Sequence, residues 1–436
     1  MLQKFSEVRP LLLATAILGM FPSFTALSQS LYAEWPFLGR YAGPINPLKL
    51  ASPLIFIWLW SRWADLPVRL RTVLLTGLVL GTLGTITGGL GCNPVPPALV
   101  REWAVLVLGV AAVMSVFLCG KRGLFAVLIG WTGIVYGSVL LNFISPEVLT
   151  WVNTHLFDPL RKIPPRGDLQ FLMGFYDVAS LGKLLMWLPW VLGFALWQRW
   201  PEQRVRIAFG FFPFAILSTV LSLWTTQRGP FIGMLAGWFA FFGHLWWISR
   251  RKRVLAVAIA VFASILAGVL LISPKDLISK RVSPLFSSSA KLEGVGPAPG
   301  GAPTAAHASV LQRKRLYELN LSEVAKHPLG HACTPKEEYE KRGIIDPSHT
   351  HSLILEQFKA RGWLWGLFHL ALWLIALVQT WRVRSLAASA LIGGICATLV
   401  MGLADHPWFV LNHAMILAFF LFAWVFMDRD KMQSWT

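Results

Sequence analysis

The chain has 436 residues, of which 55% are hydrophobic and only 14% are charged, and its formal net charge is +18. Globular proteins carry about 25% charged residues, so this composition excludes an ordinary soluble domain and is typical of a polytopic membrane protein, whose helical spans each take about 20 apolar residues. The positive charges lie in short clusters between apolar runs, a pattern that indicates loops meeting anionic lipid and argues against binding of nucleic acid.

The first apolar segment, residues 10–28, has some features of a cleaved signal peptide, because small residues near Ala26 follow a basic start. We interpret it as an uncleaved first span, since many more apolar segments follow and Pro22 lies late in it. Helices are the expected spanning elements, because lipid offers no partner for unpaired backbone groups. The sequence thus predicts an all-α, polytopic integral membrane protein with about 12 transmembrane helices, at 10–28, 47–61, 72–91, 102–119, 123–144, 171–197, 206–225, 229–249, 254–273, 363–381, 385–404 and 408–427.

Basic clusters follow every second predicted span. They include SRWADLPVRLR, GKRG, QRWPEQRVR, SRRKRV and WRVRS, and DRDKM lies near the end of the chain. The short connections between them are poorer in Lys and Arg. The positive-inside rule therefore predicts that these clusters and both termini are cytoplasmic.

Two predicted loops on the opposite side contain most of the remaining polar sequence. Residues 145–170 include NTHLFDPLRKIPPRGD, and residues 274–362 form the longest polar stretch, with a flexible GVGPAPGGAPTAA linker. We therefore divide the chain into spans 1–9 (1–273), the large outer loop (274–362) and spans 10–12 with a short tail (363–436).

The large outer loop contains one predicted helix. The spacing from Val310 to Lys326 is helical, with apolar Leu316, Leu319 and Val324 on one side. This segment carries Arg313 and Arg315.

Arginines at the predicted outer face are candidates for anion binding. Arg228, in TTQRGPF, occupies the tight turn between two spans, and a guanidinium group can bind phosphate oxygens in a bidentate manner. The alternative is an interfacial Arg whose charge reaches the headgroup layer. For Arg313, Arg315 and Arg281 the alternative is a solvated charged face or contact with lipid headgroups.

His351 is the candidate general base. It lies just before a long apolar run, with His349, Asp346 and Glu356 nearby. An imidazole exchanges protons near neutral pH. Two arginines and one histidine at one membrane face suit a reaction with a diphosphate leaving group, because the arginines stabilise the departing charge while the histidine deprotonates the attacking hydroxyl.

Other polar residues favour different interpretations. Asp177 and Lys183 lie within the predicted span 171–197, and ionisable residues inside spans often mark transport pathways, which keeps a transporter as an alternative. Asp405 and His406 lie near the outer end of 385–404 and could line the same pocket as His351. The sequence contains no phosphate-binding glycine loop, no GxSxG motif and no metal-ligand cluster that we identified, so we expect neither a cofactor nor a metal.

Three motifs, taken together and in order, resemble the O-antigen ligase/polymerase family of bacterial membrane glycosyltransferases. QRGPF resembles the family's Ser-Arg-Gly turn, with Gln227 in place of Ser. RKRLYELNLSEVAKHPLGH resembles its Arg-aromatic-apolar-His-Pro-Leu-Gly segment, where the spacing back from His327 selects Arg313 and the second Gly is missing. HSLILEQFKARGWLWG resembles its His-Asn/Ser start of a span, with Gly362 in register and Gly366 one residue late.

The resemblance implies a GT-C-like enzyme of the bacterial inner membrane with a periplasmic active site. Its donor would be an O-antigen glycan on undecaprenyl diphosphate, and its acceptor a sugar hydroxyl of lipid A–core. Arg228 and Arg313 would hold the diphosphate, His351 would activate the acceptor, and no metal would be required.

Ligase and polymerase share these motifs, and two features favour a ligase. One outer loop dominates, and no Arg-(ten residues)-Gly pattern of the kind described for some polymerases begins at Arg161, Arg166, Arg228, Arg313 or Arg315. Arg161 and Arg166 would meet the phosphates of lipid A, or alternatively ordinary anionic lipid. A polymerase, another lipid-linked glycan transferase and a transporter remain alternatives. Cys92 and Cys333, predicted on the same outer side, are candidates for a disulfide.

Overall fold

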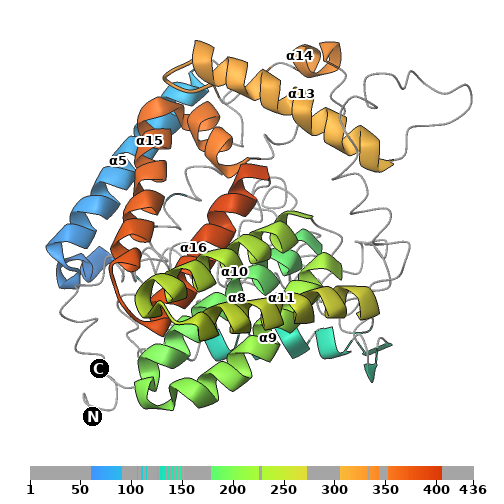
Figure 1. Cartoon of the computed structure of the whole chain (residues 1–436). Helices are drawn as coiled ribbons and strands as arrows, with labels where there is room; N and C mark the ends of the chain where they lie inside the picture. Colours follow the sequence, from blue (N-terminus) through green and yellow to red (C-terminus); the bar gives the residue numbers. More distant parts are fainter. Residues whose placement is uncertain are drawn as a thin grey trace, which may run out of the picture.

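The computed structural model describes most of the second half of the chain and parts of the first. The described residues are 60–90, short pieces between 106 and 151, 178–224, 228–272, 305–331, 334, 336–342 and 352–404. Within these residues every regular element is a helix, which confirms the predicted all-α class. The α-helices are α5 (Val68–Gly89), α8 (Val178–Arg199), α9 (Arg204–Trp224), α10 (Arg228–Ser249), α11 (Lys252–Ile272), α13 (Ala305–Lys326), α14 (Lys336–Lys341), α15 (Leu353–Trp381) and α16 (Leu386–Ala404) (Figure 1).

Six described helices are long and apolar enough to cross a membrane. They span Val68–Gly89, Pro201–Leu223, Gly229–Ser249, Lys252–Leu271, Ile354–Trp381 and Leu386–Leu403. These helices overlap six of the predicted spans, with different bounds, and confirm a polytopic membrane protein. The predicted spans 10–28, 47–61, 102–119 and 408–427 lie outside the described residues, wholly or nearly so.

Helix α8, which overlaps the predicted span 171–197, packs against α9, α10 and α16. Trp187 and Trp190 on this helix are completely buried. The Trp190 ring lies so close to Gly237 of α10 and Gly393 of α16 that a Cβ at either glycine would be within 2.9 Å of it. Small residues of this kind allow helices to pack closely in a membrane, where the hydrophobic effect does not drive their association.

Helices α10 and α16 run in opposite directions. A Cβ added at Gly233 of α10 would lie 2.8 Å from the Ala397 carbonyl oxygen, and one at Gly237 would lie 2.8 Å from that of Gly393. The start of α10 therefore lies beside the end of α16. Helix α8 runs parallel to α10, because Met186 of α8 lies against Gly233 and Trp190 lies against Gly237.

Helices α5 and α15 form a second antiparallel pair (Figure 1). A Cβ at Gly77 would lie 3.2 Å from the Phe368 ring, and Gly88 lies against the Ala360 carbonyl group. The end of α5 therefore meets the beginning of α15.

These directions bring the basic connections to one end of the molecule. His244, near the end of α10, contacts the Trp381 carbonyl oxygen at 3.0 Å, so the ends of α10 and α15 lie together. Helix α13 lies across the opposite end (Figure 1). The basic residues at the first end include Arg62, Arg69, Arg71, Arg199, Arg204, Arg206, Arg250, Arg251, Arg253, Arg382 and Arg384.

Candidate functional site

Helix α15 is broken at Gly362, and a turn that follows α13 packs into the break. Gly362 has φ 79° and ψ 177°, which is not a helical conformation. The Trp363 N–H, just after the break, donates to the Pro328 carbonyl oxygen at 2.8 Å. The His331 N–H donates to the Lys359 carbonyl oxygen at 2.6 Å. The helix interruption therefore exposes backbone groups that bind the HPLGH turn directly.

Two glycines make this contact possible. Gly330 in the turn has φ 99°, and both it and Gly362 adopt positive φ values that residues with a Cβ rarely take. A Cβ at Gly330 would lie 2.8 Å from the Gly362 nitrogen, and one at Gly362 would lie 2.6 Å from the Leu329 carbonyl carbon. The structure thus brings together the two motif segments that the sequence analysis singled out around His327 and Gly362.

The end of α5 completes this junction. The Thr87 hydroxyl donates to the Leu329 carbonyl oxygen at 2.7 Å, across a long sequence separation. The Arg361 guanidinium donates to the Thr85 hydroxyl at 3.2 Å. The turn after α13 is therefore held between α5 and α15.

The last turn of α16 connects α13 with the start of α15. The final carbonyl groups of a helix have no partner within the helix. Here the Ser352 hydroxyl donates to the Gly402 carbonyl oxygen at 3.3 Å, and the Tyr317 hydroxyl donates to that of Leu403. Since α10 begins at Arg228 beside this end of α16, the segments carrying all three motifs meet at one end of the molecule.

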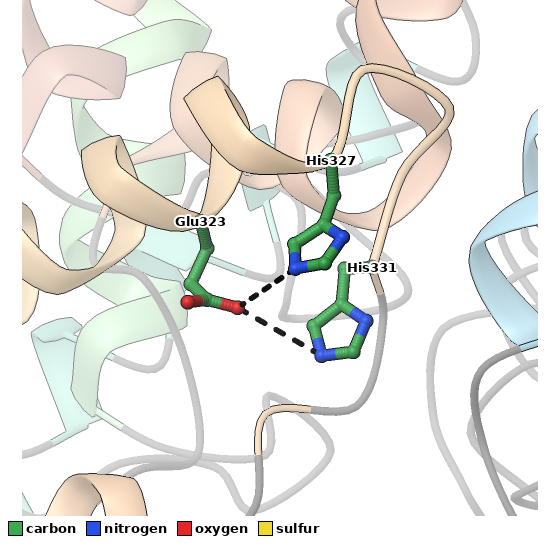
Figure 2. Close-up of side chains that lie close together, drawn as sticks. All are labelled: Glu323, His327 and His331. Carbon is green, nitrogen blue, oxygen red and sulfur yellow. Dashed lines mark ion pairs between the residues drawn. The ribbon is translucent and has the colours of Figure 1, made fainter.

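A cluster of one carboxylate and two imidazoles lies at the end of α13 (Figure 2). The Nε2 atoms of His327 and His331 are both 3.8 Å from the same carboxylate oxygen of Glu323. The two imidazole rings are stacked, with centroids 4.4 Å apart and an interplanar angle of 20°. The sequence analysis did not find this cluster, although the spacing of Glu323 and His327 places them on one helical face.

Polar residues before Gly362 are buried, although the sequence analysis assigned them to the outer loop. Helix α15 begins at Leu353 rather than at residue 363. Lys359 donates from Nζ to the Tyr339 hydroxyl at 2.9 Å, and Arg361 donates to the Gln357 side-chain oxygen at 2.9 Å. Their hydrogen bonds explain why these polar side chains can be buried.

Comparison with protein families agrees with this geometry. Residues 213–370 match the family model described as O-antigen ligase. This part of the chain is similar to the O-antigen ligase family. The matched region contains α10, α13, the HPLGH turn and the break in α15. A comparison with curated proteins found no match.

The O-antigen ligase match includes several of the residues predicted to act on substrate. Arg228 is the first residue of α10, and Arg313 lies one turn before Tyr317 in α13. Arg315 is exposed, and its guanidinium donates to the Arg342 carbonyl oxygen at 3.2 Å. Their roles in binding substrate remain predictions. The other predicted residues lie outside the described part of the chain: His351, His349, Arg281, Arg161 and Arg166, together with Asp177, Asp405, His406, Cys92 and Cys333.

The buried Lys183 in α8, which kept a transporter among the alternatives, lies outside the matched region.

His244 contacts the Ser389 hydroxyl at 2.9 Å as well as Trp381, so it links helices within the bundle.

Proposed function

We propose that this protein is an O-antigen ligase that transfers a glycan from undecaprenyl diphosphate to a sugar hydroxyl of lipid A–core. The observation that carries the proposal is the meeting of the three motif segments around the last turn of α16. Ser352 and Tyr317 contact consecutive carbonyl groups there, and α10 begins beside them at Arg228.

The distribution of charge supports a periplasmic reaction. The basic connections gather at the end of the molecule opposite α13, and the positive-inside rule assigns such connections to the cytoplasm. The end with α13 and Ser352 is then periplasmic. A donor carried by undecaprenyl diphosphate in the outer leaflet would reach this end without crossing the bundle.

Arg228 and Arg313 are proposed to bind the diphosphate. Arg228 is the first residue of α10, and the helix dipole also favours negative charge at the start of a helix. Arg313 lies one helical turn before Tyr317, whose hydroxyl contacts Leu403 at the end of α16. Two guanidinium groups near this end would neutralise the charge that develops as the diphosphate leaves.

His351 is proposed to be the general base. It immediately precedes Ser352, whose hydroxyl contacts Gly402 and also accepts the Leu355 N–H at 3.4 Å as the cap of α15. In the proposed reaction the imidazole removes the proton from the acceptor hydroxyl. The hydroxyl oxygen then forms the new bond to the anomeric carbon, the bond from that carbon to the phosphate oxygen breaks, and undecaprenyl diphosphate leaves.

A reconstituted assay tests the proposal. Purified protein is mixed with glycan-linked undecaprenyl diphosphate, with and without lipid A–core. A glycan–lipid A product that requires the acceptor is the expected result. A ladder of longer lipid-linked glycans formed without the acceptor would identify a polymerase instead. If active substrates yield neither product, the transferase proposal fails and transport of the lipid-linked glycan becomes the next activity to measure.

A further inference from the structure

The cluster at the end of α13 has the composition and spacing of a metal-binding site. Glu323, His327 and His331 each offer one ligand atom, and the three atoms lie within 4.8 Å of one another. Each imidazole Nε2 is 3.8 Å from the Glu323 carboxylate. Zinc bound tetrahedrally at about 2.0–2.1 Å separates its ligand atoms by about 3.4 Å, so the two imidazole–carboxylate distances of 3.8 Å are each longer than this by only about half an ångström.

We propose that Glu323, His327 and His331 bind a divalent transition-metal ion, with Zn²⁺ as the best-matched metal. The proposal goes beyond the proposed glycan transfer and does not rest on it. Two imidazole nitrogens and one carboxylate oxygen form a ligand set that suits zinc and related transition metals, whereas Mg²⁺ and Ca²⁺ prefer oxygen ligands throughout.

Backbone hydrogen bonds hold the chain in place at all three ligand positions. Glu323 lies in the last turn of α13, and His327 follows the helix directly with its N–H bonded to the Glu323 carbonyl oxygen. This four-residue spacing is the one by which two helical residues share one zinc ion. His331 is fixed by the turn, because Gly330 N–H donates to the His327 carbonyl oxygen at 3.0 Å and His331 N–H donates to that of Lys359 at 2.6 Å. Ligands held in place by backbone hydrogen bonds lose less freedom on binding.

The arrangement of the two rings also fits a single metal ion. Both imidazoles direct Nε2 toward the same Glu323 oxygen while their rings are stacked 4.4 Å apart (Figure 2). One cation placed between His327, His331 and Glu323 would bind both nitrogen atoms and the carboxylate oxygen at once.

The site is open on one side. The His327 side chain is 43% exposed, whereas Glu323 is 10% and His331 is 19% exposed. Three protein ligands leave a position for water or another small ligand. The ion would join α13 to the turn whose Pro328 carbonyl oxygen binds Trp363 at the break in α15. We therefore expect metal binding to stabilise this junction.

Metal binding is measured on the full-length protein, purified through a tag without histidine and treated with a chelator. Titration with ZnCl₂ by calorimetry should show one tight site per chain, and elemental analysis after dialysis should recover one zinc. Replacing zinc by Co²⁺ should produce a visible absorption spectrum. Glu323→Gln, His327→Gln and His331→Gln should each weaken zinc binding by more than about 100-fold, since even residues that only orient metal ligands contribute 10–100-fold.

Two matched variants on the same helix control for nonspecific binding. Glu318→Gln removes an exposed carboxylate of α13, and His307→Gln removes a histidine near the start of that helix. Both should bind zinc as the wild type does. Zinc should also raise the melting temperature of the wild type and of these controls, but not that of His327→Gln.

Three results would overturn the proposal. The chelated wild type could fail to bind zinc at micromolar concentrations, the three ligand variants could bind as tightly as Glu318→Gln, or millimolar Mg²⁺ could displace the zinc. Because neither donor nor acceptor is present, these results leave the glycan-transfer proposal untouched. Transfer assayed with and without chelator asks separately whether the ion affects turnover.

Discussion

Gly362→Ala is expected to destabilise the junction between α15 and the HPLGH turn. Gly362 has φ 79° and ψ 177°, a region of backbone space that is essentially restricted to glycine. Holding another residue there costs about 1–3 kcal/mol. The new Cβ would also lie 2.6 Å from the Leu329 carbonyl carbon and 2.7 Å from the Pro328 oxygen.

The contact adds to the backbone strain. Both neighbours of the new Cβ belong to the backbone of the turn, so no flexible side chain can move aside. Overpacking of this kind costs about 1–3 kcal/mol, which gives roughly 2–6 kcal/mol together with the strain. A protein stabilised by about 5–15 kcal/mol cannot absorb that without a visible effect. The turn is expected to move away from Trp363.

Thermal unfolding in detergent and hydrogen exchange together test this expectation. The melting temperature should fall, and the Trp363 amide should exchange faster, because its bond to the Pro328 carbonyl oxygen is lost. Gly243→Ala in α10 is the matched control, since a Cβ there meets nothing within 4 Å. Alanine is favoured over glycine in a helix by about 0.5–1 kcal/mol, so this variant should melt at the wild-type temperature or slightly higher.

Equal behaviour of the two variants would refute the reasoning. If Gly362→Ala melts like Gly243→Ala and the Trp363 amide stays protected, then the close approach of the turn to the α15 break does not determine stability.

The other predictions concern the proposed chemistry and the packing of α13. His351→Ala should lower transfer by at least about 10²-fold with unchanged expression and donor binding, and near-normal turnover would reject the base. Arg228→Ala and Arg313→Ala should each lower the rate by about 10²-fold or more; wild-type kinetics for both Arg228→Lys and Arg228→Ala would reject the diphosphate clamp. Tyr317→Phe removes the hydrogen bond to the Leu403 carbonyl oxygen, so it should cost about 1 kcal/mol and speed hydrogen exchange in α13, whereas unchanged exchange would show that this bond does not dock the helix.

Local periodicity was enough to predict some of the site. The spacing between Val310 and Lys326 predicted a helix with Leu316 and Leu319 on one side, and the structure forms α13 there and buries both leucines. The family resemblance selected the HPLGH motif and Gly362 as parts of two separate motifs, and only the structure shows that they are in contact.

The buried polar residues of α15 could not be predicted in the same way. Lys359 and Arg361 appear in the sequence as charges of a solvated loop. Their burial depends on Tyr339 and Thr85, which lie in other elements and far away in the sequence. No periodicity within the segment carries that information.

The histidine and glutamate cluster was missed for a related reason. Glu323 and His327 are close through helical spacing alone, but His331 lies three residues after Pro328 and beyond the helix. Its position is set by the positive φ of Gly330 and by the Lys359 carbonyl group. Only the tertiary structure shows that the His331 side chain lies beside those of Glu323 and His327.

The last carbonyl groups of α16 bind side chains from two other segments, and this limits where residues can be inserted into the chain. Helix α16 is fixed at one level by Gly393 beside Gly237, and its end binds the hydroxyls of Ser352 and Tyr317. One residue inserted between these levels would turn the terminal carbonyl groups by about 100° and displace them by about 1.5 Å. Added residues in the GVGPAPGGAPTAA linker would cost only the slowly growing entropy of a longer loop. Homologous chains should therefore vary in length before α13, whereas α16 should keep a constant number of residues.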